Sequence, residues 1–325
     1  MRVLVTGGAG FIGSVVAAEL VQAGHTVCIY DNLIHGHRKA VIPSAEFVLG
    51  DVADRKTLEE TLRRFKIEAV LHFAALIEAG ESMQAPEKYF RNNSAGTLSL
   101  IESMLACGVR KLVFSSTAAL YGEPKRTPIE ESAVLRPTNV YGESKLIAES
   151  MLTWFSRIHG MRYASLRYFN AAGATVELGE DHRPESHLIP NILQVAMGKR
   201  ESVSIFGSDY PTHDGTCIRD YIHVTDLASA HILALVALDE HPCLIYNLGN
   251  GRGFSVREVI QTARKITGHK IPVVEAPRRP GDPAVLVASS EKIQRELGWK
   301  PKFPTLDAII ASTWQWYQKF PEGYQ

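Results

Sequence analysis

Three glycines near the amino terminus constrain the fold more than any other feature of the chain. Gly7, Gly10 and Gly13 separate a short apolar segment from a segment of helical periodicity at residues 11–23. Glycines at a strand-to-helix turn allow a tight bend and a close approach of the backbone to a bound group, while the N–H groups that open the helix attract an anion. Asp31 lies 18 residues beyond Gly13, at the end of the next apolar segment, where a carboxylate can accept both hydroxyls of a ribose. This combination predicts a dinucleotide site.

Short apolar segments alternate with longer helical ones as far as residue 169. We expect strands at Val3–Thr6, Thr26–Tyr30, Glu46–Leu49, Ala69–His72, Lys111–Ser115 and Tyr163–Arg167. The alternation is typical of a Rossmann-type doubly wound parallel sheet covered by helices on both faces. The predicted fold class is therefore α/β.

The chain becomes less regular beyond residue 169. We expect a strand at Val203–Phe206 and helices at His187–Met197 and Val224–Leu238. We therefore predict an NAD-binding Rossmann domain at residues 1–169, with a return to it near residues 220–245. A smaller C-terminal α/β domain at residues 170–325 would bind the substrate.

Composition excludes several classes of function. The 35 basic residues balance the 35 acidic ones, so nothing in the charge favours nucleic acid or a membrane surface as a partner. Four widely spaced cysteines form no C-x-x-C pair, so we expect no disulfide framework and no metal site. Without a leader-like or membrane-spanning apolar run, the expected location is cytoplasmic.

The residues around Asp31 address the choice of dinucleotide. A carboxylate repels a 2′-phosphate, and Asn32 rather than arginine follows it, so NAD is expected in preference to NADP, although Arg38 and Lys39 are nearby cations. Asp51, after the third strand, would hold the adenine amino group or cap the next helix.

A second constellation predicts proton transfer. Tyr141 and Lys145 lie four residues apart in a helical segment, which places both side chains on one face. A neighbouring ammonium and a positive nicotinamide ring both favour the phenolate, so the tyrosine can act as a base near neutral pH. Hydroxyls at residues 115–117 follow the fifth strand, at the sheet edge where such folds bind ligands, or else form an ordinary turn.

These motifs resemble those of a known family. The G-G-A-G-F-I-G loop, H-F-A-A, F-S-S-T-A-A-L-Y-G and Y-G-E-S-K are similar to the extended short-chain dehydrogenase/reductase family, and closest to its UDP-galactose (UDP-glucose) 4-epimerases. The resemblance extends over the whole chain and includes R-Y-F-N-A-A-G-A, H-L-I-P, Y-P-T-H-D-G-T-C-I-R-D-Y-I-H-V, Y-N-L-G-N-G and R-R-P-G-D.

The resemblance implies a role for each matching position. Tyr141 is the implied base, Lys145 grips the nicotinamide ribose, and Thr117 lies beside the sugar O4. The implied NAD-binding residues are Gly7, Gly10, Phe11, Ile12, Gly13, Asp31, Asn32, Asp51, Val52, Phe73, Ala74, Ala75, Asn92, Ser115, Tyr141, Lys145 and Tyr168. The implied substrate-binding residues are Thr117, Tyr141, Asn170, His187, Leu188, Ser204, Phe206, Arg219, Arg279, Asp282 and Leu286.

Among the latter, Asn170 and Leu188 would hold the diphosphate, Arg219 and Arg279 would bind phosphates, Phe206 would face uracil and Asp282 would bind the uridine ribose. Arginines offset a diphosphate's charge with forked donors; the alternative for Arg219 is an ion pair with neighbouring Asp220.

Two positions depart from the family pattern. Ile77 replaces a lysine that often reaches the NAD phosphates, which leaves retention of the cofactor open. Leu286 aligns with a bulky tyrosine near the sugar, so the pocket is expected to admit N-acetylated sugars.

The implied reaction inverts C4 of UDP-glucose or UDP-galactose through a transient 4-keto sugar and bound NAD, in a homodimer built on the helices at 89–105 and 140–155. Epimerases of other UDP-sugars, including UDP-GlcNAc/GalNAc and UDP-pentoses, stay open. A dehydratase or decarboxylase is a further alternative, yet dehydratases carry an Asp-Glu pair where this chain has Ala118 and Ala119. A non-catalytic NAD-sensing protein would be expected to lack the Tyr141 and Lys145 pair.

Overall fold

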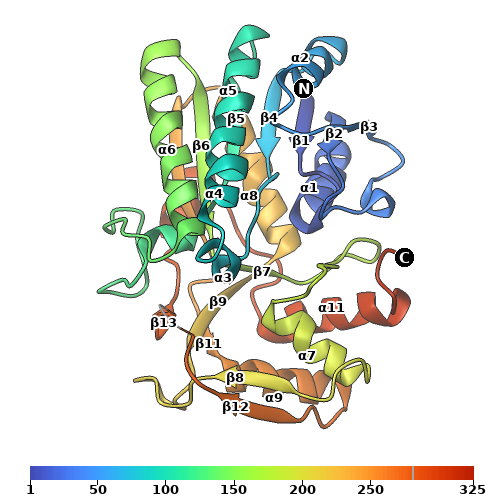
Figure 1. Ribbon diagram of the computed structural model, residues 1–325, viewed down its shortest axis with the longest axis vertical. Coiled ribbons are helices and arrows are strands. Elements are labelled where there is room, and N and C mark those ends of the chain that lie inside the picture. The colour runs from blue at the N-terminus through green and yellow to red at the C-terminus, as the bar shows by residue number, and fades with distance from the viewer. Residues whose placement is uncertain (280–281) are drawn as a thin grey trace.

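A parallel sheet of seven strands forms one half of the molecule (Figure 1), in a computed structural model that describes residues 1–279 and 282–325. Its strands are β1 (Arg2–Thr6), β2 (Thr26–Asp31), β3 (Glu46–Leu49), β4 (Ala69–His72), β5 (Lys111–Thr117), β6 (Arg162–Tyr168) and β10 (Cys243–Leu248). They lie in the order β10-β6-β5-β4-β1-β2-β3, and every neighbouring pair is parallel. The predicted Rossmann-type fold class is confirmed, and the six expected strands appear with ends shifted by at most two residues.

Helices cover both faces of this sheet. On one face, α1 (Phe11–Gln22) packs against α8 (Val224–Ala237), which leads the chain from the other half of the molecule back into β10. The other face is covered by α2 (Arg55–Arg64), α5 (Gly96–Ala106) and α6 (Val140–His159). Short 3-10 helices occupy Arg38–Ala40 (η1) and Ala118–Tyr121 (η3). Among the described helices, none is long and apolar enough to cross a bilayer.

The helix expected at residues 89–105 is present, but it includes a π-helical segment. Two one-turn helices, α3 (Ala79–Ser82) and α4 (Pro86–Tyr89), precede a π-helical segment η2 (Phe90–Ala95), and α5 follows it directly. The buried Asn93 amide donates to the Leu76 carbonyl and to Ser144 Oγ, both at 3.0 Å. These bonds hold the wide turn in place, and such π turns frequently occur at functional sites.

The other half of the molecule is built around β9 (Ile218–His223). This strand pairs with β7 (Asn170–Ala172), β11 (Gly253–Ser255) and β13 (Val285–Leu286), while β8 (Val203–Phe206) pairs with β12 (Val273–Ala276). Its helices are α7 (Leu188–Ala196), α9 (Val256–Thr267), α10 (Glu291–Leu297) and α11 (Leu306–Lys319).

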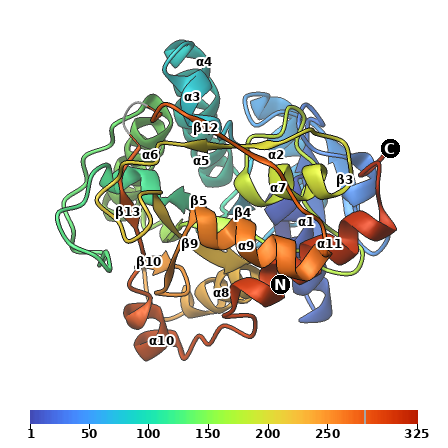
Figure 2. The same ribbon diagram turned by 90° about the horizontal axis from the view of Figure 1, so that it is seen from below.

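Seen from below, α9 and α11 lie side by side (Figure 2), and their apolar faces share a core with α7 and β8. Pro280 and Gly281 of the R-R-P-G-D motif lie outside the described residues.

Candidate active site

A cavity of about 390 Å³ opens at the carboxyl ends of the parallel strands, where the strand order reverses between β1 and β4. Ligands bind at this position in doubly wound sheets. The residues that the sequence assigned to NAD all line it: Gly7, Gly10, Phe11, Ile12, Gly13, Asp31, Asn32, Asp51, Val52, Phe73, Ala74, Ala75, Asn92, Ser115, Tyr141, Lys145 and Tyr168.

Two of the three loop glycines, Gly7 and Gly13, lie where only glycine fits. A Cβ on Gly7, whose φ is +71°, would lie 2.5 Å from the Ala74 backbone nitrogen, and a Cβ on Gly13 would lie 2.2 Å from the Gly7 oxygen. At Gly10 the nearest atom to such a Cβ is 3.4 Å away, so this glycine borders the cavity rather than another strand. Because Gly10 caps α1 without a side chain, the opening N–H groups of the helix suit a phosphate.

Asp31 ends β2 in a fixed orientation. Its carboxylate accepts hydrogen bonds from the backbone of Ala9 at 2.9 Å and of Leu33 at 2.8 Å, and the residue is buried at the cavity wall. Arg38 and Lys39, the two nearby cations that could have favoured NADP, have other partners. The Arg38 guanidinium lies 4.2 Å from the centre of the Phe47 ring, and Lys39 donates a hydrogen bond to the carbonyl of Gln325. The surroundings of Asp31 thus suit a free 2′-hydroxyl rather than a phosphate.

Asp51 and Asn32 form the next part of the wall. Asn32 donates to the Asp51 carboxylate at 2.8 Å, and the other Asp51 oxygen accepts from the Ala53 backbone. The N-cap of α2 is Asp54, which accepts from Thr57 at 3.2 Å, so Asp51 is not the cap of that helix.

Tyr141, Lys145 and Thr117 meet because α6 approaches the end of β5 closely. Asn139 caps α6, and a Cβ on Gly142 would lie 2.8 Å from the Ala119 carbonyl oxygen, so only glycine allows this distance. The ammonium of Lys145 donates to the Ser115 carbonyl at 3.0 Å and lies over the Phe114 ring.

Burial shifts both titratable groups of this trio. Burial raises the pKa of Tyr141, while a hydrogen bond with Thr117 lowers it by a smaller amount. Burial lowers the pKa of Lys145 to about 7. In the protein without a bound cofactor, these pKa shifts disfavour both the Tyr141 phenolate and the Lys145 ammonium. The predicted lowering of the Tyr141 pKa by Lys145 is not evident. A positive group in the cavity would therefore have a large effect on the Tyr141 phenol.

The residues assigned to the substrate fall into two groups. Thr117, Tyr141, Asn170 and His187 line the cavity, and Leu188 follows His187 as the first residue of α7. Ser204, Phe206, Arg219, Arg279, Asp282 and Leu286 belong to the lower half of the molecule, outside this lining.

Within the second group the side chains pair with one another. Arg219 forms an ion pair with Asp282, and Arg279 lies 4.1 Å from the centre of the Phe206 ring. The alternative pairing of Arg219 with Asp220 does not occur, because the buried Asp220 carboxylate accepts backbone N–H groups. Leu286 lies beside Arg219 in register and packs with Ala118, Tyr121 and Phe169 near the end of β5.

Sequence reasoning missed part of the cavity wall. Glu78, Glu81, Glu180, His182 and Arg183 also line it. The available signal was a repeated Glu-x-His pattern at residues 180–182 and 185–187.

Comparison with known proteins identifies the family. The sequence model of the NAD dependent epimerase/dehydratase family matches residues 3–249. A UDP-glucose 4-epimerase of Streptomyces lividans is 53% identical over 324 residues, which cover 99% of this chain and 98% of that protein.

Solved structures agree in fold over the whole length. A crystal structure of a UDP-glucose 4-epimerase superimposes with a TM-score of 0.97 at 50% identity and covers 100% of both chains. The UDP-glucose 4-epimerase of Bifidobacterium longum, solved in complex with NAD+ and UDP, gives a TM-score of 0.95 at 40% identity and covers 99% of this chain and 100% of the other.

Proposed function

The chain belongs to the NAD dependent epimerase/dehydratase family, and from that premise we propose that it interconverts UDP-glucose and UDP-galactose by inverting C4 of the sugar. It is an isomerase that uses NAD. The observation that carries the proposal is the meeting of Tyr141, Lys145 and Thr117 in one cavity at the switch point of the sheet. Ala118 and Ala119 follow directly, so the acid pair needed for dehydration is absent from that turn.

The backbone and side chains that line the cavity fit an NAD molecule. The space beside Gly10, the uncapped start of α1 and the fixed Asp31 carboxylate suit a pyrophosphate and a ribose. When bound, NAD supplies the hydride acceptor and donor that no side chain can provide. Lys145 would grip the nicotinamide ribose, and Phe73, Ser115 and Tyr168 would line the ring's surroundings.

Tyr141 is the proposed base and acid. It takes the proton from the sugar O4 and later returns it, while Thr117 holds the same oxygen by a hydrogen bond. Because burial raises the pKa of Tyr141, a positively charged neighbour is needed to favour the phenolate at neutral pH. The positive nicotinamide ring of bound NAD would supply that charge, while Lys145, on the same face of α6, would hold the nicotinamide ribose.

The lower half of the molecule would hold the UDP group. Arg219 and Arg279 carry forked donors for phosphate oxygens, and the Phe206 ring offers a flat apolar face for uracil. Asp282 would exchange its ion pair with Arg219 for the uridine ribose hydroxyls. Binding of the UDP group away from the reacting carbon would keep the 4-keto sugar near Tyr141 while the sugar rotates.

We assign residues 1–169 to the NAD-binding domain and residues 170–325 to the UDP-sugar domain. The placement of α8 and β10 on the seven-stranded sheet supports a return of the chain to the first domain at about residues 220–245.

A second substrate class follows from Leu286. This side chain packs beside Ala118 at the end of β5, with less volume than a tyrosine there. We therefore include UDP-N-acetylhexosamines among the substrates.

The proposed assembly is a cytoplasmic homodimer. Trp154 and Ile158 lie one turn apart on α6, and their relative exposures are 57% and 68%. Two such large apolar side chains on one helix suit a helix-to-helix contact with a second copy. Light scattering after gel filtration should give a mass twice that of one chain for the wild type. For a Trp154→Glu variant, the measured mass should fall to that of one chain.

Incubation with UDP-galactose without added NAD tests the function. Formation of UDP-glucose by the purified protein supports epimerisation with retained cofactor, and recovery of activity only after NAD addition supports a cofactor that exchanges. Absence of turnover under both conditions, with a ligand-induced rise in melting temperature, would contradict the proposal and favour a binding protein.

A further inference from the structure

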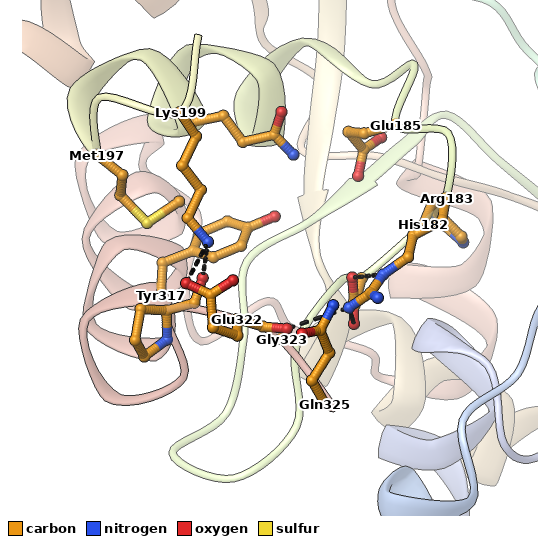
Figure 3. Close-up of a pocket in the computed structure, with 12 residues that line it drawn as sticks. His182, Arg183, Glu185, Met197, Lys199, Tyr317, Glu322, Gly323 and Gln325 are labelled. Atoms are coloured by element: carbon orange, nitrogen blue, oxygen red, sulfur yellow. Dashed lines mark hydrogen bonds and ion pairs between the residues drawn. The ribbon is translucent and has the colours of Figure 1, made fainter.

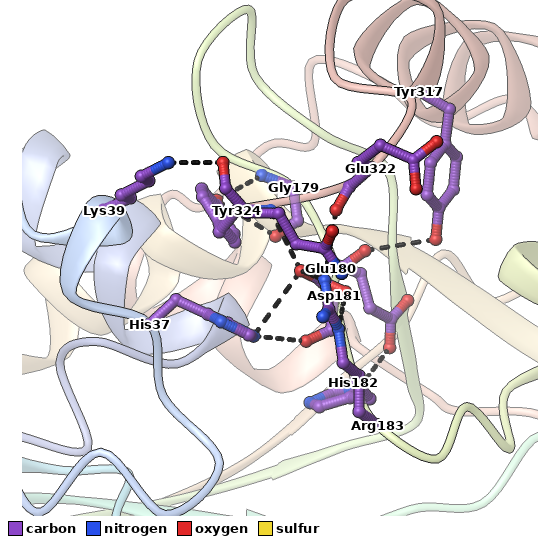
Figure 4. A network of polar contacts seen from close by, with 11 residues as sticks. His37, Lys39, Gly179, Glu180, Asp181, His182, Arg183, Tyr317, Glu322 and Tyr324 are labelled. Carbon is purple, nitrogen blue, oxygen red and sulfur yellow. Dashed lines mark hydrogen bonds and ion pairs between the residues drawn. The ribbon is translucent and has the colours of Figure 1, made fainter.

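Four side chains with metal-binding atoms converge on the segment that leads into α7. Glu180, His182, Glu185 and His187 each place one nitrogen or oxygen within 4.8 Å of those of the other three. Glu180, His182 and His187 line the same cavity as Tyr141, but no proton or hydride transfer step of the proposed reaction uses the group. Figure 4 shows Glu180 and His182 from this segment, and Figure 3 shows His182 and Glu185.

Both carboxylates of this cluster are deeply buried. The side chains of Glu180 and Glu185 are 4% and 5% exposed. Among the described residues, the ion-pair partners of these two acids are histidines alone: Glu180 contacts His182 and His187, and Glu185 contacts His187. Two buried carboxylates thus have two imidazole rings as their ion-pair partners.

One oxygen of the cluster has no partner. Glu185 Oε1 accepts from the backbone nitrogens of Ser186 and His187, each at 2.8 Å, and from His187 Nδ1 at 3.0 Å. Its second oxygen, Oε2, is buried without a hydrogen-bond partner among the described residues. A buried carboxylate oxygen left without a donor is costly, and this one belongs to a carboxylate already inside the cluster.

The spacing is close to that of a coordination sphere. Glu180 Oε1 lies 3.1 Å from His182 Nδ1 and 2.9 Å from His187 Nδ1. Ligands of a tetrahedral Zn²⁺, each about 2.1 Å from the ion, lie roughly 3.4 Å apart, so small side-chain movements would suffice. Two imidazoles with two carboxylates favour a first-row transition ion over Mg²⁺ or Ca²⁺, which prefer oxygen ligands alone.

An entry path is also present. His182 and Glu185 line a second cavity of about 290 Å³, which Lys199, Tyr317 and Glu322 border on the other side (Figure 3). Glu180, His182 and His187 line the cofactor cavity. The cluster therefore forms the wall between the two spaces.

We propose that Glu180, His182, Glu185 and His187 bind one divalent transition-metal ion, of the Zn²⁺ class, which fixes the segment at residues 180–187 against the rim of the cofactor cavity. This site revises the expectation that the chain holds no metal. Glu185 Oε2 provides the free acceptor, and the carbonyl of Glu180 is already anchored by Tyr317 Oη at 3.1 Å (Figure 4). The role is structural, since the ion would take no part in proton or hydride transfer.

Zinc binding to the intact protein tests the site. The tag-free chain would be stripped with EDTA, freed of chelator and titrated with ZnCl2 against a competing fluorescent chelator, with metal content measured after gel filtration. We expect one Zn²⁺ per chain, and at least tenfold weaker binding by Glu185→Gln and by His182→Asn. His213→Asn is the matched control, because exposed His213 also lies 3.6 Å from a carboxylate, that of Glu258, yet belongs to no such group among the residues that the structure describes.

A spectroscopic measurement keeps the test independent of variant folding. X-ray absorption of the zinc-loaded wild type should show nitrogen and oxygen neighbours at about 2.0–2.1 Å. Sulfur neighbours would assign the ion to a cysteine such as the exposed Cys243 and overturn the proposal. Failure of the wild type to retain Zn²⁺, or equal binding by all four proteins, would overturn it as well.

Discussion

Lys145 donates a 3.0 Å hydrogen bond from its ammonium to the carbonyl oxygen of Ser115, which ties the helix of the base to the strand that ends in Thr117. This bond joins residues 30 positions apart and holds the buried ammonium at the cavity wall. Lys145→Met should therefore lower kcat/KM by about a thousandfold and reduce the NAD content of the purified protein.

The matched control is Lys292→Met. Lys292 makes the same kind of bond, 3.0 Å to the carbonyl of Ile245, away from the cavity. Steady-state assays of both variants should separate them; equal activities would refute the role of Lys145.

Tyr141→Phe should fold normally and lose at least a hundredfold in kcat, because Tyr141 is the group proposed to exchange the O4 proton. Tyr163→Phe removes a buried hydroxyl that bonds Thr153 at 3.0 Å, and it should keep near-normal activity. Circular dichroism checks the fold of both. Near-normal epimerisation by Tyr141→Phe would show that another residue is the base.

Ile77→Lys should strengthen the retention of NAD. Ile77 lines the cofactor cavity and is 38% exposed, so a lysine there could reach a phosphate without displacing the core. We expect a several-fold slower loss of NAD on dialysis. Val134→Lys, at an 82% exposed position elsewhere, serves as the control for added charge. An unchanged rate of NAD loss in both variants would show that the cofactor does not depend on a cation at position 77.

Leu286→Tyr should change substrate preference. The larger ring would occupy the space beside Ala118 and Tyr121, where an N-acetyl group would otherwise lie. We expect the ratio of kcat/KM for UDP-GlcNAc to that for UDP-glucose to fall by about tenfold, as is typical when a pocket loses room for a small group. A constant ratio would remove Leu286 from the specificity pocket.

Acid should destabilise the protein partly through His231. Burial lowers its pKa from 6.5 to about 4. Between these two pH values His231 is protonated in the unfolded chain but neutral in the folded chain. The contribution of His231 to stability is complete above pH 6.5 and falls by about 1.4 kcal/mol per pH unit towards pH 4.

His231→Phe keeps an aromatic ring between Phe73 and Tyr168 and should flatten the pH dependence of the urea midpoint in that window. His241→Phe, at an exposed position, should leave it unchanged. If both variants keep the wild-type slope, another group accounts for the acid sensitivity.

Local patterns predicted much of the first half of the chain. The strand at Ala69–His72 was placed with its observed ends, because alternating apolar and helical segments depend on neighbours in sequence. One helix was predicted without its π-helical segment: residues 89–105 are helical, but Phe90–Ala95 forms a π-helix, where the Asn93 side chain bonds to Leu76 and Ser144. Those partners lie 17 and 51 residues away, so no local propensity reports them.

The sequence by itself determined the glycine loop, Asp31 and the i, i+4 pair of Tyr141 and Lys145, because turn geometry and helical periodicity are local properties. Only the tertiary structure decided that Arg219 pairs with Asp282, and that Glu180, His182, Glu185 and His187 converge. The first depends on contacts across 63 residues. The convergence of the four residues depends on how the irregular segment at residues 180–187 folds and packs against α11. Neither the spacing of residues nor the composition determines that packing.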